Sequence, residues 1–173
     1  MHIGLGLPIS DPTALLDWAG KPFGTDCGPI GPAPLSPAGP ELLFGGFQPA
    51  ALDRVGRWGG GFLAAAAPAW AGGLFETVRR SWTDHGRPGA PRIVAQVNAA
   101  LGSDDVVADA RASMGAYYEF TGMAEKMVSG MFTTPGEIRH AIAQFADLGA
   151  DEVMLYCYSR DADQVDRLAE VLS

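Results

Sequence analysis

Two glycines between an apolar run and a proline are the residues whose types and spacing best fit binding chemistry. Gly45 and Gly46 end the apolar run 42–44. Pro49 then suits a first helical turn, because its missing N–H would be unpaired there anyway. A strand that ends in glycines at a helix N-terminus offers free backbone N–H groups to an anion, typically a phosphate. The segment therefore predicts a site for a phosphate-bearing ligand.

Residues 41–67 form the unit that must position this site. Apolar residues recur at helical spacing after Pro49, namely Ala51, Leu52, Val55 and Trp58. A glycine run then leads into a second buried strand at 62–66. A buried strand, a helix and a second buried strand predict a βαβ unit with parallel strands.

The rest of the chain repeats this alternation. Strands are predicted at 2–7, 42–46, 62–66, 92–101 and 152–158, with helices between them. This order predicts an α/β fold with about five parallel strands, an incomplete TIM-barrel-like sheet, because a complete eightfold barrel typically needs about 250 residues. We expect one domain over 1–173, made of a first βα unit at 1–19, a Pro/Gly-rich connector at 20–40 and a C-terminal barrel portion at 41–173.

Several patterns predict which side chains are buried. A stripe of Trp70, Leu74, Val78 and Trp82 on a helix from Pro68 to about His85 favours packing on the sheet over a cofactor box. A capping box at 134–137 starts a helix that Gly149 ends. We expect strand 152–158 to be buried together with Cys157. The final helix, 161–172, should turn Val165, Leu168 and Leu172 inward.

The composition narrows the classes of partner. The chain has 173 residues, 47% of them hydrophobic, and a formal net charge of −8. Such an acidic chain is not expected to bind nucleic acid or an anionic membrane as a general partner. No apolar run approaches the roughly 20 residues of a membrane span, and the first eight residues are too short for a secretory signal. Cys27 and Cys157 provide no disulfide framework, which predicts a cytoplasmic protein.

Common catalytic constellations do not appear in the sequence. His2, His85 and His140 lie in different predicted elements, without a carboxylate or cysteine at metal-ligand spacing. We therefore expect no metal site, and the nucleophile motif of serine hydrolases is absent as well. His85 is expected at a helix end, where a cation is mildly favourable. Arg79 and Arg80 are expected on a solvated face. The catalytic residues stay unknown at this stage.

Three segments together resemble a known family. MHIGLGLP at the start, PELLFGGFQPAALDRVGRWGGGFLAA and TTPGEIRHAIAQFADLGADEVMLY are similar in order and spacing to the first strand, a late strand–helix–strand unit and the last helix and strand of bacterial luciferase-like monooxygenases. That family consists of TIM-barrel oxidoreductases that use a flavin or the deazaflavin F420. The resemblance implies that Gly45, Gly46 and Phe47 lie at one side of the cofactor phosphate and Ala65 and Ala66 at the other.

The resemblance also implies partners. They are a small organic substrate, a separate flavin reductase and a homodimer that completes one sheet.

The chain departs from the family at two places. Where many deazaflavin-using relatives carry polar or basic residues, this chain has Ala64–Ala67 and Pro68, so no side-chain cation is expected at the phosphate. Together with the acidic net charge of −8, this favours reduced FMN over F420, whose tail carries extra carboxylates. The block between the first helix and the connector is absent, which indicates a large internal deletion near Trp18 and Ala19.

Two further functional hypotheses stay open. The chain could be a catalytically inactive relic of the family that binds a flavin or a phosphate. It could also be an unrelated βα protein that binds another phosphorylated ligand at Gly45 and Gly46. Both differ from the function that the family resemblance implies, in which the chain is a flavin-dependent oxidoreductase or monooxygenase.

Overall fold

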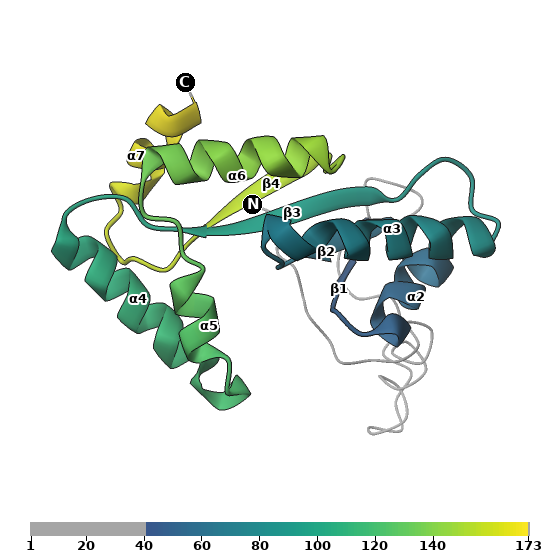
Figure 1. Cartoon of the computed structure of the whole chain (residues 1–173), viewed down its shortest axis with the longest axis horizontal. Coiled ribbons are helices and arrows are strands. Elements are labelled where there is room, and N and C mark those ends of the chain that lie inside the picture. The colour runs from purple at the N-terminus through teal and green to yellow at the C-terminus, as the bar shows by residue number, and fades with distance from the viewer. Residues whose placement is uncertain (1–40, 173) are drawn as a thin grey trace, which may run out of the picture.

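The computed structural model describes residues 41–172, so the strand expected at 2–7, the helix after it and the connector lie outside the described residues. The described elements run in chain order (Figure 1). They are β1 (Leu43–Gly45), α2 (Pro49–Trp58), β2 (Gly61–Ala64), α3 (Pro68–Asp84), β3 (Arg92–Ala99), α4 (Asp104–Tyr118), the 3-10 turn η1 (Glu119–Thr121), α5 (Ala124–Ser129), α6 (Pro135–Asp147), β4 (Glu152–Cys157) and α7 (Gln164–Leu172).

The strands form a four-stranded, fully parallel sheet in the order β1-β2-β3-β4. Register pairs Gly45 with Leu63, Ala64 with Ala95, and Ala99 with Cys157. Each neighbouring pair is joined through at least one helix, as parallel strands require. The predicted α/β class and the incomplete barrel-like sheet are confirmed, with four strands in the described part of the chain.

One face of the sheet packs on helices. Phe62 and Ala64 of β2 and alternate residues of β3 belong to one buried cluster with residues of α2, α3, α6 and α7. Because side chains alternate across a strand, these four helices share one side of the sheet. Phe75 of α3 links the layers, with its ring 6.4 Å from that of Phe62 and 6.5 Å from that of Phe145.

The opposite face carries polar groups. On β3 it presents Arg92, Gln96 and Asn98 together with the buried Val94, and these four alternate with the helix-facing residues. Arg92 bonds Glu41 at 2.5 Å through Nη1, and its Nη2 bonds the carboxylate of Glu152. In a closed barrel this face would line the interior, so β3 contributes a polar stripe to the inner side.

Local helix signals are confirmed. Pro49 and Pro68 occupy the first turns of α2 and α3. At α6 the Thr134 side chain accepts from the backbone of Glu137, and the Glu137 carboxylate accepts from the Thr134 N–H, which is a complete capping box. Gly149 has φ +77° directly after this helix, a conformation that a glycine adopts without strain.

Several burial predictions were wrong. β4 lies at an edge of the described sheet, and its Tyr156 and Cys157 are exposed, whereas its β-prone composition predicted a buried strand. In α7 the buried apolar residues are Leu168 and Val171, whereas Val165 is 73% exposed. Leu172 is also mostly exposed. Arg79 is not simply solvated, because its guanidinium donates to the Leu148 and Gly149 carbonyls.

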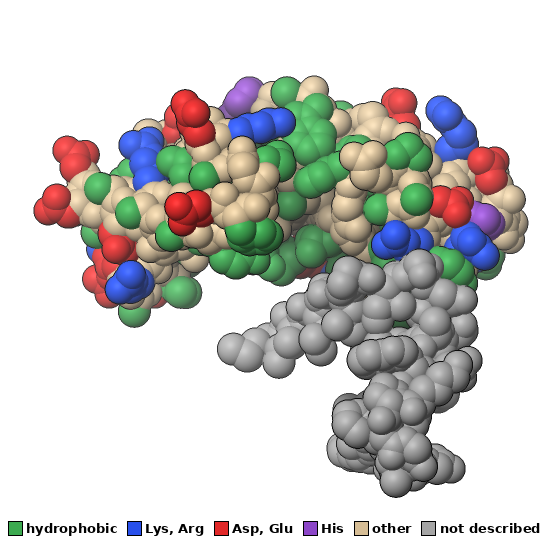
Figure 2. Space-filling view, turned by 90° about the horizontal axis from the view of Figure 1, so that it is seen from below, with side chains coloured by type: hydrophobic (Ala, Val, Ile, Leu, Met, Phe, Trp, Pro, Cys, Tyr) green, Lys and Arg blue, Asp and Glu red, His purple; other side chains and the backbone are tan. Residues whose placement is uncertain are grey.

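The described part is elongated in Figure 1, where α4 and α5 project away from the sheet near the carboxyl end of β3. Figure 2 shows apolar side chains across the centre of one face, with charged side chains mainly toward both ends. None of the helices between residues 41 and 172 is long and apolar enough to cross a membrane.

Candidate functional site

All four strands end at one edge of the sheet, which we call the carboxyl edge. Their last residues are Gly45, Ala64, Ala99 and Cys157. In open parallel α/β sheets this edge is where ligands bind. The residues singled out from the sequence follow β1 and β2 here, since Gly46 and Phe47 come directly after Gly45, and Ala65 and Ala66 come after Ala64.

The two glycines are required by packing and backbone conformation. Gly46 has φ +133°, and a Cβ added there would lie 2.7 Å from Cβ of Ala51 in α2. At Gly45 an added Cβ would meet the Leu63 carbonyl oxygen at 3.3 Å. The first turn of α2 lies so close to Gly46 that this packing explains the glycine without a ligand. The Gly-Gly pair alone therefore does not identify a phosphate site.

An aromatic contact connects the ends of β1 and β2. The Phe47 ring lies 5.2 Å from that of Trp70, at an interplanar angle of 59°. Phe47 follows β1, while Trp70 lies in the first turn of α3, after β2. The rings are 44% and 41% exposed, so the Trp70 ring is not part of the helix stripe that packs on the sheet. The sequence missed this role because a helical period does not show which turn extends beyond the sheet.

A cavity of about 80 Å³ lies at the carboxyl edge beyond β2. β2 ends beside Ala95, whereas β3 continues to Ala99, so Gln96 and Asn98 form an overhang that β2 does not cover. Phe132 bridges to Ala99 in place of the missing strand. The lining residues come from four parts of the chain: Ala65, Ala66, Ala67, Pro68, Trp70, Gln96, Val97, Asn98, Lys126, Met127, Gly130, Phe132 and Phe145.

Two of the five predicted cofactor-binding residues line this cavity. They are Ala65 and Ala66, whereas Gly45, Gly46 and Phe47 do not line it, although Phe47 packs on its wall residue Trp70. The structure adds Gln96, Asn98 and Lys126, which no motif indicated. Their positions follow from the unequal lengths of β2 and β3 and from the return of α5 over the edge, neither of which is visible as a local pattern.

The polar groups of the cavity are two amides and one ammonium. Nε2 of Gln96 donates to Oδ1 of Asn98 at 3.0 Å, so Oε1 of Gln96 and Nδ2 of Asn98, which have no hydrogen-bond partner within residues 41–172, can bind a ligand. Nζ of Lys126 lies 5.6 Å from the Trp70 ring centroid, a cation–π contact. No acidic residue lines this cavity. The expectation that no side-chain cation would be present near 64–68 was therefore wrong, because α5 supplies one from a distant part of the sequence.

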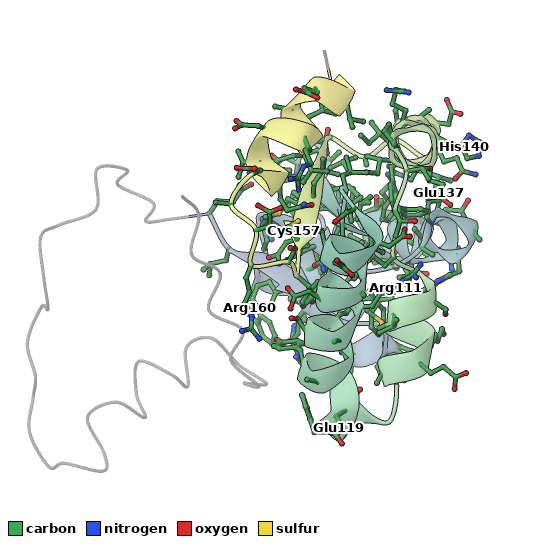
Figure 3. The ribbon with its side chains drawn as sticks, turned by 90° about the vertical axis from the view of Figure 1, so that its left-hand side faces the viewer. Arg111, Glu119, Glu137, His140, Cys157 and Arg160 are labelled. Atoms are coloured by element: carbon green, nitrogen blue, oxygen red, sulfur yellow. The ribbon has the colours of Figure 1, made fainter. Side chains whose placement is uncertain are left out.

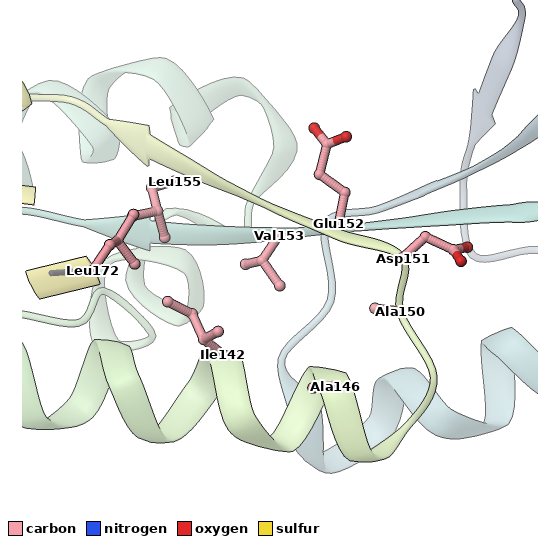
Figure 4. Close-up of a pocket in the computed structure, with 8 residues that line it drawn as sticks. All are labelled: Ile142, Ala146, Ala150, Asp151, Glu152, Val153, Leu155 and Leu172. Atoms are coloured by element: carbon pink, nitrogen blue, oxygen red, sulfur yellow. The ribbon is translucent and has the colours of Figure 1, made fainter. Parts of the chain in front are cut away.

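A larger groove lies beside β4 and has a different character. Its volume is about 290 Å³, and most of its walls are apolar, with Ile142 and Leu172 facing β4 (Figure 4). Its two carboxylates are already engaged, since Asp151 accepts from the Ile93 N–H at 2.8 Å and Glu152 pairs with Arg92. Size alone favours this groove, but the chemistry favours the carboxyl-edge cavity.

The carboxyl edge of β4 holds phenols and a thiol. Tyr158 donates to the Tyr118 hydroxyl at 3.4 Å. Burial raises the pKa of Tyr158, so this group stays a neutral hydrogen-bond donor. Burial also raises the pKa of the Cys157 thiol. Cys157 and His140 are well separated in Figure 3, with His140 on the outer side of α6, so no thiol–imidazole pair forms. Within 41–172 no group of three side chains is arranged to hold a metal.

Comparisons with known proteins were informative only at the level of structure. No protein-family model matches the chain, and no curated protein does. Among solved structures, an F420-dependent secondary alcohol dehydrogenase bound to an F420-acetone adduct matches with a TM-score of 0.60 and 20% identity, over 83% of this chain and 49% of that one. The monooxygenase RslO1 from Streptomyces bottropensis matches with a TM-score of 0.51 and 15% identity, over 82% and 48%.

The chain has the fold of part of a luciferase-like barrel. It spans about half the length of the two solved proteins. The resemblance that the sequence motifs indicated is thereby confirmed at the level of the fold, while cofactor, substrate and activity do not follow from a similarity of this degree.

Proposed function

We propose that the chain works as a luciferase-like oxidoreductase subunit that binds the phosphate-bearing part of a reduced flavin or deazaflavin. The observation that carries this proposal is the cavity at the carboxyl edge, because Ala65 and Ala66 line it together with two amides and the ammonium of Lys126, which forms no ion pair within residues 41–172. When bound, such a cofactor would supply the redox chemistry, and the protein would supply binding and orientation. Reduced FMN is the first candidate and F420 the second.

The described residues fit only one end of that cofactor. Cavities for drug-sized ligands are typically about 300–1,000 Å³, whereas this one measures about 80 Å³. It suits a phosphate and excludes a fused three-ring system. The ring would have to lie outside the cavity, along the inner face of the sheet.

A homodimer is part of the proposal. Among the described strands, β1 and β4 are the two edges of the sheet, and exposed edges in proteins are usually covered or paired. A second copy would supply walls for the ring and complete one sheet. A separate flavin reductase would deliver the reduced cofactor to this cytoplasmic subunit, and a small organic molecule would be its substrate.

A catalytically inactive relic is the second candidate. It is favoured by the carboxyl edge itself, where burial raises the pKa of Cys157 and of Tyr158, and where no basic side chain among residues 41–172 is hydrogen-bonded to either group. A relic would bind the phosphate-bearing ligand without turnover.

Anaerobic titration with reduced FMN and with reduced F420 tests binding. We expect saturable binding, and we expect Ala65→Leu to weaken it by filling the cavity. Ala69→Leu is the matched control, because Ala69 is exposed on α3 and does not line the cavity. Light scattering during size exclusion reports the dimer. Absence of binding to both cofactors would reject the proposal. Binding without oxygen consumption or substrate oxidation, with a reductase present, would support the relic.

A further inference from the structure

Lys126 is the cation of the carboxyl-edge cavity. It lies in α5, and it is the lining residue there with a positive side chain. Among the described residues it forms no ion pair, and its ammonium rests over the Trp70 ring at 5.6 Å. With no acidic side chain in the lining, the cavity walls carry one positive side chain in a chain of net charge −8.

The surroundings favour a small anion at this position. An exposed cation–π contact is weak compared with an ammonium–phosphate hydrogen bond. An arriving anion could therefore draw the Lys126 ammonium from the Trp70 ring without breaking an ion pair. A cavity of about 80 Å³ admits a phosphate but not a ring system.

We propose that Lys126 binds the anionic end of the ligand and thereby selects phosphorylated over unphosphorylated forms of the cofactor. The identity of that ligand rests on the proposed function. Lysine acts on phosphate as a mobile point charge, so α5 would fix which end of the cofactor enters the cavity. This role removes one of the two reasons for preferring FMN over F420, the assumed lack of a cation, and leaves the acidic net charge of −8 as the other.

Paired ligands make the test specific, since riboflavin differs from FMN by lacking the phosphate. We expect Lys126→Met to weaken FMN binding about tenfold, the effect of losing one charged hydrogen bond, and to leave riboflavin binding unchanged. Lys126→Arg should retain most of the FMN affinity. Arg139→Met is the control for net charge, because Arg139 is exposed on α6 and lies outside the cavity. Equal FMN affinity for wild type and Lys126→Met would overturn the inference while the proposed function stands.

A second readout does not depend on the cofactor. The sequence contains two lysines, Lys21 and Lys126, so lysine labelled with ¹³C at Cε gives two signals that Lys126→Arg assigns. We expect millimolar pyrophosphate to shift the Lys126 signal, and we expect Trp70→Leu to change its starting position. A shift in a protein that binds neither FMN nor F420 would reject the proposed function and support the anion site. Absence of a shift together with absence of cofactor binding would overturn both.

Discussion

Nε2 of His85, at the end of α3, lies 2.8 Å from Oδ1 of Asp53 on α2, so this pair connects two consecutive helices across their outer surface. The hydrogen bond from His85 is the main reason that the pKa of Asp53 is below its ordinary value of 3.8. His85 was expected only as a favourable cation at a helix end, and the structure gives it a specific partner.

The Asp53 pair predicts a pH-dependent contribution to stability. A carboxyl whose pKa is lowered on folding stabilises the fold above its unfolded pKa, and this contribution is lost as the pH falls through the folded pKa. Asp53→Asn should therefore lower the free energy of unfolding near pH 6 by less than about 1 kcal/mol, since Asp53 is half exposed. Urea denaturation should show the difference disappearing below pH 3.8. Asp84→Asn, on the exposed end of α3, is the control, and an undiminished difference in acid would contradict the prediction.

Two glycines inside helices predict opposite effects of the same substitution. A Cβ added at Gly56 in α2 would lie 2.3 Å from Oγ of Ser81 and 2.7 Å from its backbone, whereas nothing lies within 4 Å of one added at Gly73 in α3. Gly56→Ala should destabilise by about 1–3 kcal/mol, because α2 and α3 would have to separate. Gly73→Ala should stabilise by about 0.5–1 kcal/mol through helix propensity. Chemical denaturation measures both, and equal effects would show that α2 and α3 are not closely packed.

The two Ser/Thr N-caps within residues 41–172 differ in a way that the sequence does not show. Thr134 forms both bonds of a capping box, while the Ser103 side chain makes no capping bond to α4. Thr134→Ala should cost about 1 kcal/mol of stability, and Ser103→Ala should cost much less. Hydrogen exchange of the first turns of α6 and α4 separates the two effects. A larger loss at Ser103 would contradict the prediction.

Neighbouring arginines on α3 should also differ. Arg79 donates to the Leu148 carbonyl at 3.2 Å and to the Gly149 carbonyl at 2.8 Å, and so satisfies the end of α6. Arg79→Met should cost about 1 kcal/mol of stability. Arg80→Met removes the same charge from an exposed position and should be nearly neutral. Thermal unfolding of the two variants, compared with wild type, makes the distinction, and matching midpoints would refute it.

The sequence alone was sufficient wherever the cause is local. Pro49 and Pro68 start their helices because proline is best tolerated in a first turn, and Gly149 ends α6 because glycine accepts a positive φ. The alternation of buried strands and helices likewise predicted a parallel α/β sheet. The segments around 41–67 and 134–158 indicated the luciferase-like fold, with which the structural comparisons agree.

Only the tertiary structure decided which surfaces these elements present. β4 has the composition of a buried strand but lies at an edge of the described sheet, and the buried side of α7 includes Val171 because of how that helix meets the core. Lys126 and Trp70 meet because β2 ends before β3 does, which leaves room for α5 over the carboxyl edge. Local patterns determine where a helix or strand begins and ends, whereas a binding cavity depends on the relative lengths and placement of elements that are far apart in the chain.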